Sequence, residues 1–125
     1  MQAPGSASRL RIYAGERDHW HGHPLPNAIL KAALERGLAG ATVLRGTLGY
    51  GGRHRVHAEH PFSVSPDLPV LIEVVDTPER IEAFLPLVQA MLRDGALITV
   101  DTVRVVLWRK GGGNLHAPIA PTPNG

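Results

Sequence analysis

Residues 49–68 carry the densest group of side chains that could bind an anion. The segment opens with Gly49-Tyr50-Gly51-Gly52 and continues with Arg53 and Arg55. Glycines let backbone N–H groups approach an anion, and arginines bind phosphate or carboxylate through two hydrogen bonds. The segment also exceeds the ~12–15 residues above which a loop is usually functional. The pattern favours an anion site, with a plain solvated loop as the alternative.

Histidines form a second group that could do chemistry. His19, His21 and His23 alternate along the chain, so on an extended segment they point to one side, and neutral imidazole is a common metal ligand. The long loop adds three more histidines, His54, His57 and His60. A metal-binding protein is therefore an alternative function. We favour exposed loop histidines with no metal, because Gly22 and Pro24 indicate no rigid scaffold around them.

Arg109 and Lys110 follow the last predicted strand and could close over an anion, or simply form a solvated end. Catalytic groups are sparse by comparison. No GxSxG or HExxH motif is present. The acidic candidates lie in separate predicted loops, without a nucleophile beside them: Asp18, Glu16, Asp76 and Asp94. Because the sequence has no cysteine, a thiol nucleophile is excluded as well. We therefore expect a binding protein, not an enzyme.

The composition indicates one ordinary globular domain. The chain has 125 residues, of which 43% are hydrophobic and 19% charged. The formal net charge is only +2, and the positive charges are scattered instead of forming the basic stripe of a nucleic-acid binder. No apolar run has the length of a signal peptide or a membrane span. We expect a cytoplasmic protein that neither inserts into a membrane nor binds nucleic acid.

The hydrophobic periodicity predicts the element order βαββαβ. Strands are expected at residues 10–14, 41–50, 69–76 and 97–108. The first helix is expected from about Pro24 to Arg36. The second should begin at an Asp76–Glu79 capping box, contain a kink or break at Pro86 and stop at Asp94-Gly95. The folded domain then spans residues 9–110, between flexible tails at residues 1–8 and 111–125.

This order predicts an α+β, ferredoxin-like fold, in which a four-stranded antiparallel sheet carries both helices on one face. Apolar residues fall on both faces of two strands. Val100 and Val103, for example, lie on opposite faces of the last strand. An apolar face without helices predicts burial against another subunit, so we expect a homo-oligomer. Acylphosphatases share this fold, but their anion loop after the first strand is missing, so such a hydrolase is the least favoured alternative.

Three stretches of the predicted domain are distinctive. They read GLAGATVLRG at residues 37–46 with Gly49-Tyr50-Gly51 after it, DLPVLIEVVD at residues 67–76, and IEAFLP at residues 81–86. Together they resemble the uncharacterised bacterial family of PII-like proteins, relatives of the nitrogen-regulatory PII signal transducers. The resemblance covers residues 9–108. It implies a ferredoxin-like homotrimer with ligand clefts between subunits.

The resemblance also implies roles for particular residues. Residues 50–68 would correspond to the PII T-loop, which contacts partner proteins, and membrane transporters are plausible partners by this analogy. Gly49, Gly51 and Arg53 fall near the phosphate-binding positions of PII, and Arg109 fits one of two arginines near the end of its last strand. Departures from PII are three: leucine at the second arginine position, no lysine in the turn after the second helix, and no tyrosine between Gly51 and Leu68.

We therefore expect a PII-like signalling protein that binds a small anionic ligand at clefts between subunits. An adenine nucleotide is one candidate, and no cofactor is expected to be required. Ligand binding would change how the long loop fits a partner protein. The expected ligand-binding residues are Gly49, Gly51, Arg53, Arg109, Arg45 and Arg55.

Overall fold

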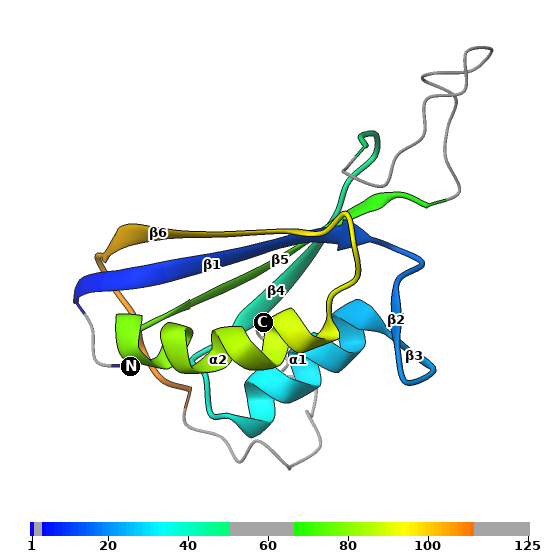
Figure 1. Cartoon of the computed structure of the whole chain (residues 1–125). Helices are drawn as coiled ribbons and strands as arrows, with labels where there is room; N and C mark the ends of the chain where they lie inside the picture. Colours follow the sequence, from blue (N-terminus) through cyan, green and yellow to red (C-terminus); the bar gives the residue numbers. More distant parts are fainter. Residues whose placement is uncertain (2–3, 51–66, 112–125) are drawn as a thin grey trace, which may run out of the picture.

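The computed structural model describes residues 1, 4–50 and 67–111. Its elements follow one another as β1 (Gly5–Gly15), β2 (His19–Trp20), β3 (His23–Pro24), α1 (Leu25–Glu35), β4 (Ala41–Arg45), β5 (Pro69–Asp76), α2 (Pro78–Met91) and β6 (Leu97–Val105). Four strands form an antiparallel sheet in the order β4-β5-β1-β6, while β2 and β3 form a separate hairpin. Both helices cover the same face of the sheet (Figure 1). The predicted α+β, ferredoxin-like fold is confirmed.

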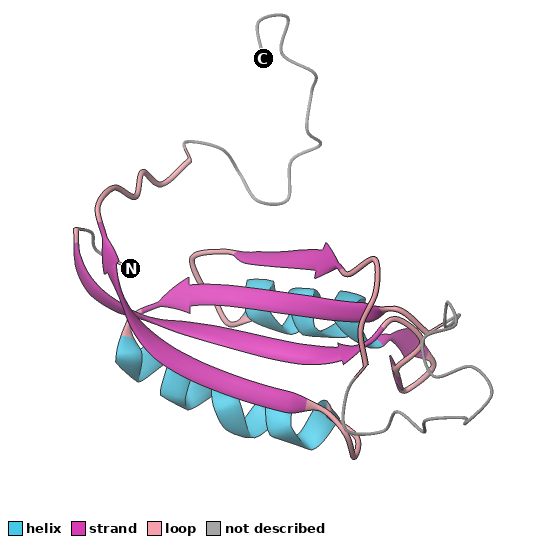
Figure 2. Ribbon diagram, turned by 90° about the horizontal axis from the view of Figure 1, so that it is seen from above, coloured by secondary structure: helices cyan, strands magenta, loops and turns pink. Residues whose placement is uncertain are grey.

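The core lies between the two central strands and the two helices. Alternate residues of β1 and β5 point toward the helices, because successive side chains of a strand face opposite sides. The helices meet them with residues spaced three or four apart. The fully or nearly fully buried members are Leu10, Ile12, Leu25, Ile29, Ala33, Ile72, Val74, Ile81, Phe84, Val88 and Met91. The opposite face of the sheet has no helix over it (Figure 2).

Helix α1 ends as the sequence predicts. Gly37 has a φ of +70°, which places it in the left-handed region that glycine adopts without a steric penalty. The Leu38 N–H donates to the Ala33 carbonyl at 3.1 Å, and the Gly37 N–H donates to the Leu34 carbonyl at 3.0 Å. These two bonds are those of a Schellman motif. They satisfy the last carbonyls of the helix and turn the chain toward β4.

The N-terminal tail predicted over residues 1–8 is too long. Strand β1 already begins at Gly5, where it pairs with Val105, and Ser8 lies between Thr102 and Asp76. The small polar residues of this stretch show no hydrophobic alternation, so periodicity could not detect it. Strand formation there depends on backbone hydrogen bonds to β6, which do not require apolar side chains.

Two predicted strands are shorter than expected. Strand β4 ends at Arg45, and the N–H of the following Gly46 still donates to the carbonyl of Pro69 at 2.7 Å. Strand β6 ends at Val105, which pairs with Gly5, the first residue of β1. The short hairpin of β2 and β3 lies in a stretch that was expected to be an irregular loop.

Helix α2 is capped by Thr77, not by the predicted Asp76–Glu79 box. The Thr77 hydroxyl accepts a hydrogen bond from the Arg80 N–H at 3.3 Å. Asp76 is instead fully buried, and its carboxylate accepts N–H groups from Ala39 at 2.8 Å and Thr77 at 2.7 Å. The helix continues through Pro86, so the predicted local break is not present.

The face opposite the helices is only partly apolar. Two ion pairs cross its middle: Arg9 with Asp101, and Arg11 with Glu73. The sequence pattern predicted an apolar second face, and the register shows that apolar and charged rows alternate along it. In the part of the chain that the structure describes, neither helix is long and apolar enough to cross a membrane.

Replacing the buried Asp76 by alanine is expected to lower the free energy of unfolding by about 3 kcal/mol, because two partly buried N–H groups would lose their acceptor. Urea denaturation of the Asp76→Ala variant measures this loss. Asp94→Ala, which removes an exposed carboxylate from a turn, is the matched control and should stay near wild type. Equal stability of the two variants would contradict the role of Asp76.

Candidate functional site

The sheet separates the predicted ligand-binding residues into two groups. Arg45 and Gly49 lie where β1 and β4 end and β5 begins, at the right of Figure 1. Arg109 follows the end of β6, at the opposite end of the sheet. Within one chain the structure does not bring these two groups together. The other three predicted residues, Gly51, Arg53 and Arg55, lie outside the described residues.

The first group belongs to a set of turns that we call the loop base, made of residues 15–18, 46–49 and 67–69. Gly46 and Gly49 pack against the ring of Pro69 so closely that an added Cβ would lie 2.7 and 3.2 Å from its Cγ atom. A side chain at Gly46 would therefore collide with a strand residue. These glycines bring together the two ends of the segment that joins β4 to β5.

Hydrogen bonds join the end of β1 to the start of β5 in the same place. The Glu16 N–H donates to the Leu68 carbonyl at 2.8 Å, and the Arg17 N–H donates to Asp67 Oδ1 at 2.9 Å. Asp18 is buried and accepts the Gly15 N–H at 3.1 Å. The loop base is thus a bonded platform from which the long segment departs.

Arg45 is the one predicted cation whose side chain lies at the loop base within the described residues. Its Nη2 atom is 3.0 Å from Oε1 of Glu16, and its side chain is largely exposed. The charges of Arg45 and Glu16 partly cancel each other. An anion that binds here would therefore compete with Glu16 or use the remaining guanidinium N–H groups of Arg45. Sequence reasoning did not select Glu16 or Asp67, because only the fold places them beside Arg45 and Gly49.

The three candidate histidines do not converge on one point. His23 lies directly opposite Trp20 in the hairpin, and His21 stacks on the Trp20 ring with centroids 4.0 Å apart. His19 instead uses its Nδ1 atom in a hydrogen bond with the Arg17 carbonyl. Among the described residues, no three histidine or acidic side chains are grouped as metal ligands. The predicted metal site at His19, His21 and His23 gains no support from this geometry.

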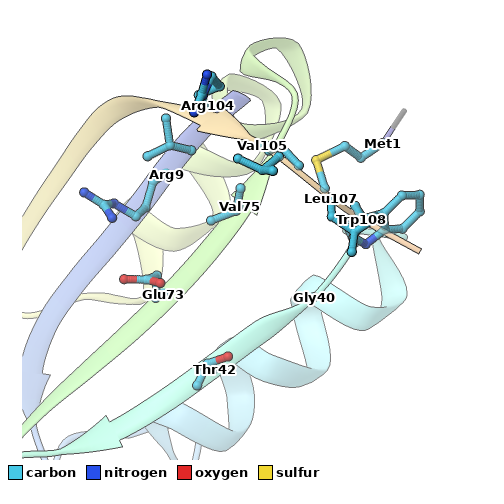
Figure 3. A pocket seen from close by; sticks show the side chains of 13 residues that line it. Met1, Arg9, Gly40, Thr42, Glu73, Val75, Arg104, Val105, Leu107 and Trp108 are labelled. Carbon is cyan, nitrogen blue, oxygen red and sulfur yellow. The ribbon is translucent and has the colours of Figure 1, made fainter. Parts of the chain in front are cut away.

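A hollow of about 620 Å³ lies at the other end of the sheet, on the face without helices (Figure 3). We call it the Trp108 hollow. Charged side chains, Arg9 and Glu73, lie on one side of it, and Leu107 and Trp108 lie on the other. The chain passes directly from this apolar wall to Arg109. The hollow was not predicted, because its walls come from four strands, the turn after α1, Met1 and the segment after β6.

The charged side of the Trp108 hollow is paired within the sheet. Arg9 donates from Nε and Nη2 to the two carboxylate oxygens of Asp101 at 3.0 and 2.6 Å, and Arg11 donates to Glu73 at 3.0 Å. The hydrogen bonds from Arg9 lower the pKa of Asp101, and the same contact raises the pKa of Arg9. The lining of the hollow holds no serine, cysteine or histidine among the described residues. The arrangement can bind a ligand or a chain, and it offers no pair of nucleophile and histidine base.

Comparison with known proteins agrees with this architecture. Residues 7–105 match the family DUF190, described as "Uncharacterized ACR, COG1993". A UPF0166 protein of Aquifex aeolicus is 36% identical over 97 residues, covering 78% of this chain and 90% of that protein. A UPF0166 protein of Methanocaldococcus jannaschii is 35% identical over 99 residues, covering 79% and 91%.

Two solved structures share the fold at low sequence identity. A PII-like signaling protein from Thermus thermophilus has a TM-score of 0.58 at 18% identity, covering 84% of this chain and 94% of that one. CPII from Thiomonas intermedia, solved with ADP, AMP and acetate, has a TM-score of 0.50 at 18% identity, covering 83% and 92%. The fold is therefore that of PII-like proteins.

The close packing at the loop base can be tested with a glycine pair. Gly46→Ala places a Cβ against Pro69 and is expected to lower the free energy of unfolding by about 1–3 kcal/mol. Gly40→Ala is the control, since an added Cβ there meets nothing within 4 Å. Chemical denaturation of both variants measures the difference, and an equally stable Gly46→Ala would show that the loop base relaxes freely.

The Arg9–Asp101 ion pair is expected to make the stability of the fold depend on pH in the acidic range. Because its pKa in the folded chain lies below the ordinary value of 3.8, Asp101 stabilises the fold above that value. The contribution is lost as the pH falls through the lowered pKa. NMR titration of the Asp101 carboxyl carbon should show a higher pKa in Arg9→Gln than in wild type. An identical pKa in both proteins would rule out this pairing in solution.

Proposed function

The chain belongs to the DUF190 (UPF0166) family of uncharacterised PII-like proteins, and on that premise we propose that it is a regulatory protein that binds a small anionic ligand between subunits. The observation that carries the proposal is the separation of the loop base from Arg109 in one chain. A site that uses both groups needs two chains.

A cyclic oligomer meets this requirement. In a ring, each interface joins two different patches, so the loop base of one subunit faces the Arg109 end of its neighbour. We propose a homotrimer with three such clefts. The exposed apolar side chains on the open face, among them Leu44, Leu97 and Leu107, favour association over a free monomer.

The proposed ligand is an anion because the residues assigned to it are arginines and close-packed glycines. Arg45 and Arg109 supply positive charge from the two sides, and the exposed stretch around Gly49 lets a ligand approach the backbone. An adenine nucleotide is the leading candidate, since CPII, which shares the fold, was solved with ADP and AMP. Bicarbonate is a second probe, because CPII was also solved with it.

The proposed output is recognition by a partner protein. The segment between Gly49 and Asp67 departs from the loop base, so a ligand held at Gly49 contacts the start of that segment. By analogy with PII, a membrane transporter is a reasonable partner. The role proposed is binding and signalling without catalysis.

Mixed oligomers test whether the site is shared. Arg109→Ala and Gly49→Val each damage one half, and each alone is expected to weaken ADP binding on the order of tenfold, measured by isothermal titration calorimetry. Co-refolding the two variants in equal amounts should restore wild-type affinity at about one quarter of the sites, because each mixed trimer has one undamaged cleft. Leu34→Ala, an exposed substitution on α1 away from both halves, is the control for substitution itself.

The result separates two architectures. A site contained within one chain regains no affinity on mixing, because every chain carries one damaged half. If wild-type protein binds neither ADP, AMP nor bicarbonate, the proposed function is rejected.

A further inference from the structure

A continuous apolar row crosses all four strands of the sheet at the loop-base end. Leu44 lies opposite Leu71, Leu71 lies opposite Tyr13, and Tyr13 lies opposite Leu97. Residues paired in this way project to the same side of a sheet. This side is the one without helices. Leu44 and Leu97 are each 55% exposed and Tyr13 is 39% exposed, so the row is largely open to solvent in a single chain.

The Trp108 hollow lies at the other end of the same face. Its apolar wall consists of Leu107 and Trp108 with Val75 and Val105 beside them, and Leu107 is 63% exposed (Figure 3). The face therefore has one apolar row and, at its opposite end, one hollow with an apolar wall. Because the row and the hollow lie at opposite ends of one face, they do not contact each other within a chain. The row of one copy can contact the hollow of a second copy.

The charges between the two patches allow copies to approach. Arg9 pairs with Asp101 and Arg11 pairs with Glu73, so the middle of the face carries two positive and two negative groups that cancel within the chain. A second copy with the same face meets no net repulsion from these groups. Since each charge already has a partner, covering the face leaves none of these four unpaired.

We propose that the apolar row of one subunit packs into the Trp108 hollow of the next subunit. The sequence neighbours of the two patches support this choice of partner. Leu44 directly precedes Arg45, and Trp108 directly precedes Arg109. Seating the row in the hollow therefore brings the backbone at Arg109 of one subunit near the backbone at Arg45 of the other. The inference rests on the proposed function and names the contact that would assemble its site.

The first test is the mass of a variant in solution. Wild type is expected to show a mass of about 40 kDa by light scattering, that of three 13.4-kDa chains, and Leu44→Asp is expected to show the mass of one chain. The fold should survive, because Leu44 is exposed in the single chain, and circular dichroism checks this. Leu34→Asp is the matched control, since Leu34 is 52% exposed but lies on α1, and its mass should equal that of wild type.

Three results overturn the inference: a wild type with the mass of one chain, a Leu44→Asp variant that keeps the wild-type mass, or a Leu34→Asp variant that dissociates equally. ADP binding is measured separately by calorimetry. A trimer that Leu44→Asp dissociates but that binds no ADP, AMP or bicarbonate retains this interface and rejects only the proposed function.

Cross-linking tests the direction of the contact. Because the chain has no cysteine, Leu44→Cys and Leu107→Cys introduce the only thiols. Under mild oxidation, the double variant should form bands of two and three linked chains, and a mixture of the two single variants should form pairs. Each single variant alone should remain mostly unlinked. Single variants that cross-link as strongly as the double variant would show like patches meeting, which overturns the inference.

Discussion

The buried carboxylate of Asp76 connects the parts on which the fold depends. It lies at the end of β5 and accepts hydrogen bonds from the first residue after the strand and from Ala39 in the turn after α1. Arg80 reinforces the connection, because its Nη1 atom is 3.6 Å from the carboxylate and donates to the Gly37 carbonyl at 2.7 Å. One side chain thus holds a strand end, a helix start and a turn together. Ala39 in that turn also lines the Trp108 hollow, so Asp76 connects the core of the domain to this part of its surface.

The open face of the sheet explains why a small domain of this type would need partners of its own kind. Both helices cover one face, and the other face keeps an apolar row and the apolar wall of the Trp108 hollow exposed. Water-exposed apolar area of this kind is costly, and association removes it. The ion pairs across the middle of the face make its burial tolerable, since they satisfy one another. A ring of subunits uses both patches at every interface, whereas a two-fold dimer would place each patch against its own copy.

The loop base combines rigidity with access. Close glycine–proline contacts and backbone hydrogen bonds hold the two ends of the long segment near each other, while Arg45 and Gly49 stay accessible. The predicted ligand-binding residues depart from the PII pattern: Arg45 at the loop base is paired with Glu16, and leucine stands where the resemblance to PII would place a second arginine near Arg109.

Several features could be read from the amino-acid order alone, because they depend on local periodicity and turn chemistry. The leucines of α1, the stop at Gly37 and the apolar run of β5 each specify their element through neighbouring residues. The register between strands is not local. It alone places Ser8 next to Asp76, ends β4 opposite Val70, joins Leu44 to Leu97 in one row and sets Arg109 at the far end from Gly49. Contacts between residues far apart in the chain depend on how strands pair and twist, so the tertiary structure decided that the predicted site is divided within one chain.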